Sequence, residues 1–140
     1  MELFEAIIAR HCFRGAFKPE PVPQDDLRKI VQAGLDAPSG RNSQTTQFVI
    51  VDDPEIVKAI NGMSGANGAQ KSAPAFILCI TDVNPDCTSD EMTFKVEDVS
   101  AAVQNMLLAL TALGYASVWI DGWLRIEGRA DAVGHLLPVP

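Results

Sequence analysis

A chain of 140 residues, 47% hydrophobic and 21% charged, is long enough to bury a core and is expected to form one domain over residues 1–140. Its net charge of -7 argues against a nucleic-acid partner, which needs a basic face. No apolar run approaches the ~20 residues of a membrane span, and no signal peptide is visible. Cys12, Cys79 and Cys87 cannot all pair and lack metal-ligand spacing, so we expect a cytoplasmic protein without a metal site.

Hydrophobic spacing, prolines and capping residues predict alternating helices and strands. Leu3, Phe4, Ile7 and Ile8 share one stripe of the first helix. We predict helices over residues 2–11, 24–37, 54–62, 97–113 and 129–137, and strands over 47–52, 75–80 and 115–120. Between them lie a proline-rich connector at 18–23, a Gly-, Asn- and Ser-rich loop at 63–72, and a polar segment at 84–91 that we expect to be mobile.

Two of these elements indicate the architecture. The predicted strand at 75–80 is apolar at every position, as expected of a strand covered on both faces. The helix at 97–113 carries an apolar stripe, interpreted as core, which consists of Val99, Val103, Met106, Leu107 and Leu110. Alternating helices and strands give the α/β or α+β class, with helices packed on a small sheet.

A polar loop at residues 38–44 separates the second predicted helix from the first predicted strand. Ser39, Asn42 and Gln44 offer hydroxyl and amide groups that can bond a polar ring edge without adding charge. Loops held between rigid elements often carry binding residues. By itself, such a loop is equally compatible with a simple turn of the chain.

A basic cluster near the N-terminus favours the interpretation of this loop as a binding loop. It reads Arg10-His11-Cys12-Phe13-Arg14 and precedes the Pro-rich turn. The order of helix, basic cluster, Ala-Pro-Ser-x-x-Asn-x-Gln loop and strand resembles the FMN-dependent nitroreductase family, and the likeness continues through 98–110 and 113–120. The resemblance implies the nitroreductase fold, an α+β fold with a small central sheet flanked by helices and completed by the dimer partner.

The resemblance implies a bound FMN whose phosphate meets the basic cluster, namely Arg10, His11, Cys12 and Arg14. Guanidinium groups suit this role because they bind phosphate through paired, charge-assisted hydrogen bonds. Cys12 stands where the family usually has serine and is a weaker donor. From the residues alone, two solvated arginines at a helix end would be the commoner explanation, and Cys12 as an activated nucleophile is a minor alternative.

The second family motif approaches the flavin from the opposite subunit. Its residues correspond here to Pro38, Ser39, Gly40, Asn42 and Gln44. The family commonly continues with Pro-Trp, where this chain has Thr45-Thr46. This departure removes a rigid corner and an aromatic wall, so it leaves the substrate preference open.

Asn67 and Gln70 lie in the loop where the family often places amide contacts to the flavin pyrimidine ring, and Lys71 could add a cation there. A plain flexible loop explains these residues nearly as well. The turn Ile120-Asp121-Gly122 resembles the one whose backbone N–H faces flavin N5. An ordinary turn after a strand is equally compatible with it. Trp119 and Trp123 could be core or pocket wall, and core is the favoured interpretation for each.

The resemblance implies a flavin-dependent oxidoreductase that transfers hydride from NADH or NADPH to nitroaromatic, quinone or similar small-molecule acceptors by a ping-pong mechanism. No side chain is a committed acid or base, so flavin N5 would carry the chemistry. Without a Gly-x-Gly-x-x-Gly motif, the nicotinamide would come and go as a substrate. The alternatives are a non-enzymatic flavin-binding module and a dehalogenating or ring-oxidising branch of the same fold.

A homodimer with shared flavin sites is also implied. We expect the 97–113 helix to form the interface core, because its apolar stripe exceeds what three strands can cover. The family continues past the point corresponding to Pro140 into another strand and a tail that wraps the partner. We therefore expect this C-terminal strand and tail to be absent from the sequence.

Overall fold

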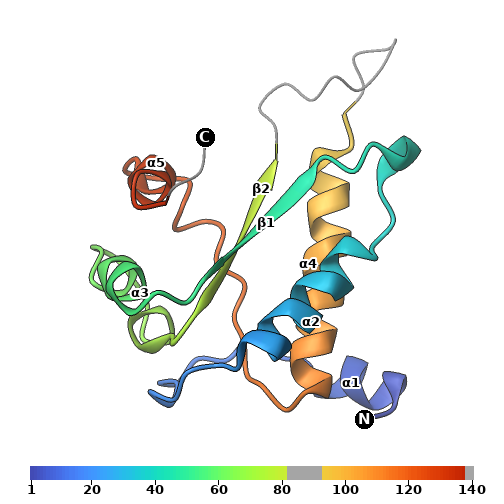
Figure 1. The fold of residues 1–140 in the computed structure, drawn as a ribbon, viewed down its shortest axis with the longest axis horizontal. Coiled ribbons are helices and arrows are strands. Elements are labelled where there is room, and N and C mark those ends of the chain that lie inside the picture. Colours follow the sequence, from blue (N-terminus) through green and yellow to red (C-terminus); the bar gives the residue numbers. More distant parts are fainter. Residues whose placement is uncertain (82–92, 138–140) are drawn as a thin grey trace.

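The computed structural model describes residues 1–81 and 93–137. Figure 1 shows its elements in chain order, which are α1 (Leu3–Ala9), α2 (Gln24–Leu35), η1 (Gly40–Asn42), β1 (Thr46–Val51), α3 (Pro54–Asn61), η2 (Gln70–Ser72), β2 (Phe76–Thr81), α4 (Lys95–Ala112) and α5 (Arg129–Gly134). The predicted helices are confirmed, although the last ends earlier than expected. The predicted polar segment at 84–91, with Cys87, lies outside the described residues.

Local sequence explains several of these boundaries. The Asp53 carboxylate accepts the backbone N–H groups of Glu55 and Ile56 at 2.9 and 3.1 Å, which caps the start of α3. Pro54 fits the first turn of α3 because a residue there needs no helical N–H bond. α4 is followed by Gly114, whose left-handed backbone (φ +85°) turns the chain away from the helix.

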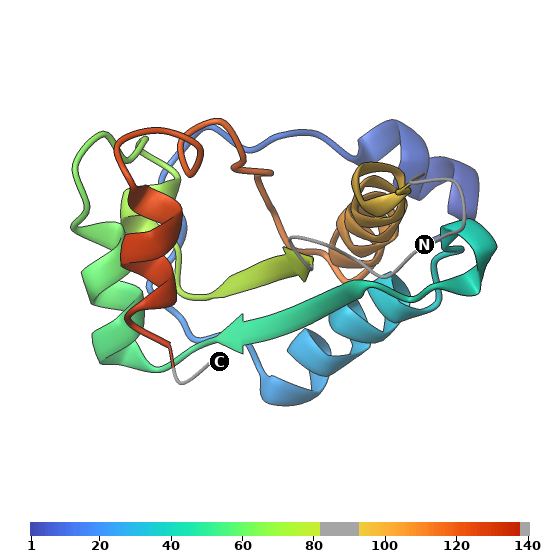
Figure 2. The same ribbon diagram turned by 90° about the horizontal axis from the view of Figure 1, so that it is seen from above.

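β1 and β2 form an antiparallel two-stranded sheet with helices on both faces. The register runs from Thr46 opposite Thr81 to Val51 opposite Phe76. Figure 2 shows α3 and α5 on one side of the sheet and α2 and α4 on the other. This arrangement confirms the α+β architecture of a small sheet flanked by helices.

Each face of the sheet builds its own core. Toward α2 and α4, the buried residues are Ile30, Val103, Met106 and Leu107, packed with partly buried Phe48, Ile77 and Cys79. Toward α3 and α5, they are Val51, Val57, Ile60 and Val133, packed with partly buried Val49, Phe76 and Leu78. Successive strand side chains point to opposite faces. The uninterrupted apolar run of β2 therefore serves both cores, as predicted.

The prediction of a third strand at 115–120 is wrong. This segment makes a single parallel bridge, between Ser117 and Cys12, and the Phe13 N–H donates to the Ser117 carbonyl at 2.8 Å. A cavity separates the segment from β2. Because a strand is stabilised by a hydrogen-bonded neighbour along its length, these apolar residues lie extended without forming a ladder.

The 97–113 helix was expected to form the dimer-interface core because its apolar stripe was judged too large for the chain to cover. That reason is also wrong. α2 and the sheet cover the stripe of α4, and Val103, Met106 and Leu107 are buried within the chain. The uncovered helix face belongs to α1, where Leu3, Phe4, Ile7 and Ile8 are all exposed. In the described part of the chain, no helix is both long and apolar enough to cross a membrane.

Candidate functional site

The basic cluster (Arg10, His11, Cys12 and Arg14) follows α1 in an extended segment. Two hydrogen bonds fix this segment: Phe13 N–H to Ser117 O at 2.8 Å, and Phe17 N–H to Ser72 Oγ at 2.8 Å. His11, Cys12 and Arg14 are exposed and Arg10 is half-buried. The segment therefore runs between the 115–120 stretch and the 63–72 loop, and it presents its polar side chains at the surface.

No acidic side chain of the described residues neutralises the charge of the cluster. Among residues 1–81 and 93–137, no carboxylate forms an ion pair with Arg10 or Arg14. The His11 ring is held by a hydrogen bond between Nδ1 and the Ala9 carbonyl at 2.9 Å, with Nδ1 as the donor. Two guanidinium groups close in sequence and without internal partners are suited to an anionic ligand.

The polar loop (residues 38–44) has an unusual backbone. Arg41, Asn42 and Gln44 all adopt left-handed conformations, with φ of 53°, 57° and 51°. Asparagine tolerates this region, whereas arginine and glutamine rarely occupy it, and each such residue costs about 1–3 kcal/mol. Strain of this kind is characteristic of binding sites, where the surrounding structure holds it in place.

Hydrogen bonds inside the polar loop maintain that conformation. The Gln44 N–H donates to Ser39 Oγ at 3.1 Å, and the Ser43 hydroxyl donates to the Gly40 carbonyl at 2.8 Å. The Ser39 oxygen thus accepts a bond within the loop. The side-chain amides of Asn42 and Gln44 are both exposed, and neither has a hydrogen-bond partner in the described residues, so both are open to a ligand.

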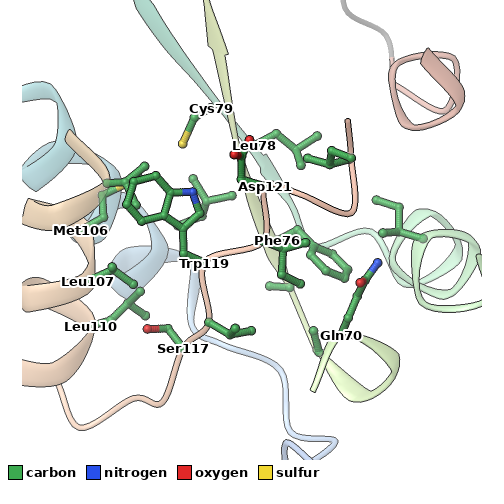
Figure 3. Close-up of a pocket in the computed structure, with 18 of the residues that line it drawn as sticks. Gln70, Phe76, Leu78, Cys79, Met106, Leu107, Leu110, Ser117, Trp119 and Asp121 are labelled. Carbon is green, nitrogen blue, oxygen red and sulfur yellow. The ribbon is translucent and has the colours of Figure 1, made fainter. Parts of the chain in front are cut away.

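The structure separates the two amides that sequence grouped together in the 63–72 loop. Asn67 is exposed, and its Oδ1 accepts the Gln70 backbone N–H at 2.8 Å. Gln70 is only 1% exposed, and its Oε1 is buried without a hydrogen-bond partner in the described chain. Figure 3 shows the Gln70 side chain at the edge of the cavity, beside Phe76. The pairing of Asn67 and Gln70 on one ring edge stays a prediction.

The turn at Ile120, Asp121 and Gly122 lies at the surface. The Asp121 carbonyl accepts the Leu124 N–H at 3.0 Å, and its carboxylate pairs with Arg125 at 2.8 Å. The ion pair raises the pKa of Arg125 through its hydrogen bond with Asp121. Asp121 and Gly122 are exposed, so their backbone is accessible to a ligand.

Trp119 and Trp123 differ from one another. The prediction of core fails for Trp119, which is 44% exposed and lines the cavity. Trp123 packs against the second core, as predicted, and its indole N–H donates to the Ser64 carbonyl at 3.0 Å. Trp119 lies within the apolar 115–120 stretch and Trp123 follows it closely, so only their tertiary surroundings distinguish them.

A partly open cavity of about 1210 Å³ lies between β2, α4 and the 115–121 segment. Figure 3 shows Cys79, Met106, Leu107, Leu110 and Trp119 around it, with polar atoms supplied by Gln70, Ser117 and Asp121. Among the described residues, the polar loop contributes nothing to the lining of this cavity. Arg10 and Arg14 do not line it either. Burial raises the pKa of the Cys79 thiol to about 11.

The predicted site residues therefore form two groups at opposite ends of α4. The basic cluster, the 63–72 loop and the 115–122 stretch lie together, joined by the bonds of Phe13 and Phe17. Figure 1 shows η1, which contains part of the polar loop, beside the N-terminal end of α4, and α1 beside its C-terminal end. An 18-residue helix spans ~27 Å. One chain does not bring the two motifs together.

Two buried charged residues were missed from the sequence. Asp98, in the first turn of α4, accepts the Gly40 backbone N–H at 2.7 Å. Arg129 donates to the Trp123 carbonyl at 3.2 Å, pairs with Glu127, and lies 5.2 Å from the Trp123 ring centre. An acidic first turn is an ordinary feature of helices, so the sequence carried no signal that either charge is buried.

The chain belongs to the nitroreductase family, whose model matches residues 7–86 and 64–140. An Archaeoglobus fulgidus protein provisionally named as an NADH dehydrogenase/NAD(P)H nitroreductase is 32% identical over 139 residues, or 99% of this chain and 78% of that protein. The NADPH-flavin oxidoreductase of Vibrio harveyi is 30% identical over 97% of this chain and 59% of its own length.

Solved structures agree with the family assignment. A Bacteroides fragilis nitroreductase with bound FMN is 27% identical and superposes with a TM-score of 0.79, over 100% of this chain and 81% of that chain. The resemblance inferred from sequence and the fold it implied are thereby confirmed. Among the described residues, no group of three or more His, Cys, Asp or Glu side chains is arranged to hold a metal ion.

Cys12 should react with iodoacetamide well before Cys79. Cys12 is exposed, whereas Cys79 is half-buried with a pKa of about 11. At pH 8, roughly one Cys79 thiol in a thousand is ionised, because each pH unit below the pKa reduces the thiolate tenfold. Timed alkylation of a Cys87→Ser variant, read by peptide mass spectrometry, measures both rates. Equal rates would contradict the burial assigned to Cys79.

Proposed function

We propose that this protein is an FMN-dependent NAD(P)H oxidoreductase of the nitroreductase type. The observation that carries the proposal is the pair Arg10 and Arg14, two guanidinium groups without ion-pair partners among the described residues, in a segment fixed by backbone bonds. The family assignment, a relative named NADPH-flavin oxidoreductase and a structural neighbour with bound FMN support it.

The residues present fit FMN. Arg10 and Arg14 would hold the phosphate, with Cys12 beside them. The exposed amide of Asn42 would bond the ring edge, and the backbone of Asp121 and Gly122 is exposed for the N5 side. When bound, FMN supplies the redox chemistry, accepting hydride from NADH or NADPH and passing electrons to an acceptor. The protein would supply position and oriented dipoles.

We propose a ping-pong sequence in which the oxidised nicotinamide leaves before a nitroaromatic, quinone or similar acceptor enters. One binding face can serve both, because no separate dinucleotide motif occurs in the sequence. Thr45 and Thr46 follow the polar loop, and both hydroxyls are buried without hydrogen-bond partners in the described chain. These threonines therefore add no aromatic wall to the acceptor side.

The active form that we propose is a homodimer with two shared flavin sites. The basic cluster and the polar loop lie at opposite ends of α4, so a second copy is needed to bring one of each together. α1 offers the contact surface, because Phe4 and Ile8 are 77% and 85% exposed. Apolar side chains clustered on one exposed helix face are typical of an interface.

The flavin of the purified protein should be bleached by NADH or NADPH and then reoxidised by a quinone or nitroaromatic. Stopped-flow absorbance of the two half-reactions measures each step separately. Bound FMN that no nicotinamide reduces would favour the dehalogenating or ring-oxidising branch or a non-enzymatic flavin module. Protein that takes up no FMN would overturn the proposal.

Arg10→Ala and Arg14→Ala should each weaken FMN binding roughly ten- to a hundredfold, because a charge-assisted hydrogen bond contributes ~1.5–3 kcal/mol. Turnover per bound flavin should change little, since the phosphate lies far from N5. Fluorescence titration measures the affinity, and Arg28→Ala, which removes an exposed arginine of α2 outside both motifs, is the matched control. Unchanged affinity in the Arg10→Ala, Arg14→Ala double variant would contradict the phosphate assignment.

Ile8→Asp should convert the dimer into monomers and lower FMN affinity, because it places a charge in the proposed apolar interface. Ile126→Asp is the control, since Ile126 is also exposed but lies outside α1. Sedimentation velocity at several protein concentrations measures the association. A wild-type protein that stays monomeric with FMN bound would refute the shared site.

A further inference from the structure

Asp98 is a buried carboxylate in contact with the polar loop. It is 5% exposed, and its Oδ1 accepts the backbone N–H of Gly40 at 2.7 Å. Its Oδ2 is also buried and has no hydrogen-bond partner in the described chain. A carboxylate with one unsatisfied buried oxygen is costly for a fold.

Gly40, which donates its backbone N–H to Asp98, is also closely packed against a neighbouring ring. A Cβ placed on Gly40 would lie 2.4 Å from ring carbons of Phe94, the residue before α4. Gly40 therefore rests directly on the Phe94 ring, with its N–H directed to Asp98. The first turn of α4 thus holds the loop by one backbone bond and one steric contact.

We call the contacts of Gly40 with Asp98 and Phe94 the anchor of the polar loop. Two features downstream of Gly40 link this anchor to the rest of the loop. Arg41 and Asn42 follow immediately in left-handed conformations, and the surrounding structure must hold them there. The Asn42 amide is exposed and has no hydrogen-bond partner in the described residues. Its direction is set by the backbone that begins at Gly40, so a change at the anchor is transmitted to the amide.

We propose that Asp98 is a positioning residue for the flavin ring, acting through Gly40 to fix the left-handed turn that presents Asn42. This inference rests on the proposed FMN function. Asp98 lies in the first turn of α4, directly beside the loop, where its Oδ1 accepts the Gly40 backbone N–H at 2.7 Å.

The test titrates four forms of the full-length protein with FMN, followed by quenching of flavin fluorescence: wild type, Asp98→Ala, Gly40→Ala and Asp53→Ala. Asp98→Ala and Gly40→Ala should weaken binding roughly tenfold or more and should alter the visible spectrum of the flavin still bound. Asp53→Ala removes the cap of α3, another carboxylate bonded to backbone N–H groups. It should lower the melting temperature and leave FMN affinity and spectrum unchanged.

Two further comparisons separate positioning from simple stability. Asp98→Asn keeps a carbonyl oxygen for Gly40 and should recover most of the affinity. In an Asn42→Ala background, Asp98→Ala should have little further effect, whereas in an Arg10→Ala background it should have its full effect. Additivity with Asn42→Ala would overturn the inference.

The remaining outcomes are equally decisive. Wild-type FMN affinity and spectrum in Asp98→Ala would overturn the inference while leaving the proposed function intact. If Asp98→Ala does not fold, Gly40→Ala decides, because it displaces the loop from Phe94 and leaves the carboxylate in place. A wild-type protein that takes up no FMN would overturn the proposed function and the inference together.

Discussion

The packing of α4 against α2 and the sheet is the constraint on which the rest of the structure depends. Ile30, Met106 and Leu107 form the centre of this contact. It fixes the direction of α4, and the two ends of α4 then determine where each candidate motif lies. The first turn holds the polar loop through Asp98. The chain leaving its other end places Ser117 beside the basic cluster.

Sequence patterns were sufficient to predict elements whose stability is local. α3 has its cap, its proline and its apolar face within one short stretch, and β2 needed only its uninterrupted apolar run. The 115–120 segment has an equally strand-like composition but forms no strand. Periodicity reports which residues avoid water, whereas a strand also requires a hydrogen-bonded neighbour. The sequence of the segment itself does not contain that information.

The same distinction between local sequence pattern and tertiary contact explains which candidate-site residues could be proposed from sequence. Arg10, Arg14 and Asn42 could be proposed from sequence because their residue types and order match a family pattern, and the structure leaves their side chains without ion-pair or hydrogen-bond partners in the described chain. Asp98 was not predictable, because an acidic residue in a first helical turn is usually solvated. Its contact with the polar loop became visible only in the tertiary structure, where the Gly40 N–H donates to its carboxylate at 2.7 Å.

The separation of the two motifs has a thermodynamic consequence for the proposed dimer. A ligand that contacts both protomers binds the dimer more tightly than the monomer, so it must strengthen dimerisation by the same factor. At a free FMN concentration of 100 times its dissociation constant, one site adds about 2.7 kcal/mol to the state that binds it. The exposed apolar face of α1 then need not hold the dimer alone. In the proposed dimer, loss of the cofactor and loss of the partner would therefore be coupled in one equilibrium. Asp98 would act on both, because the polar loop that it holds would reach the flavin of the other protomer.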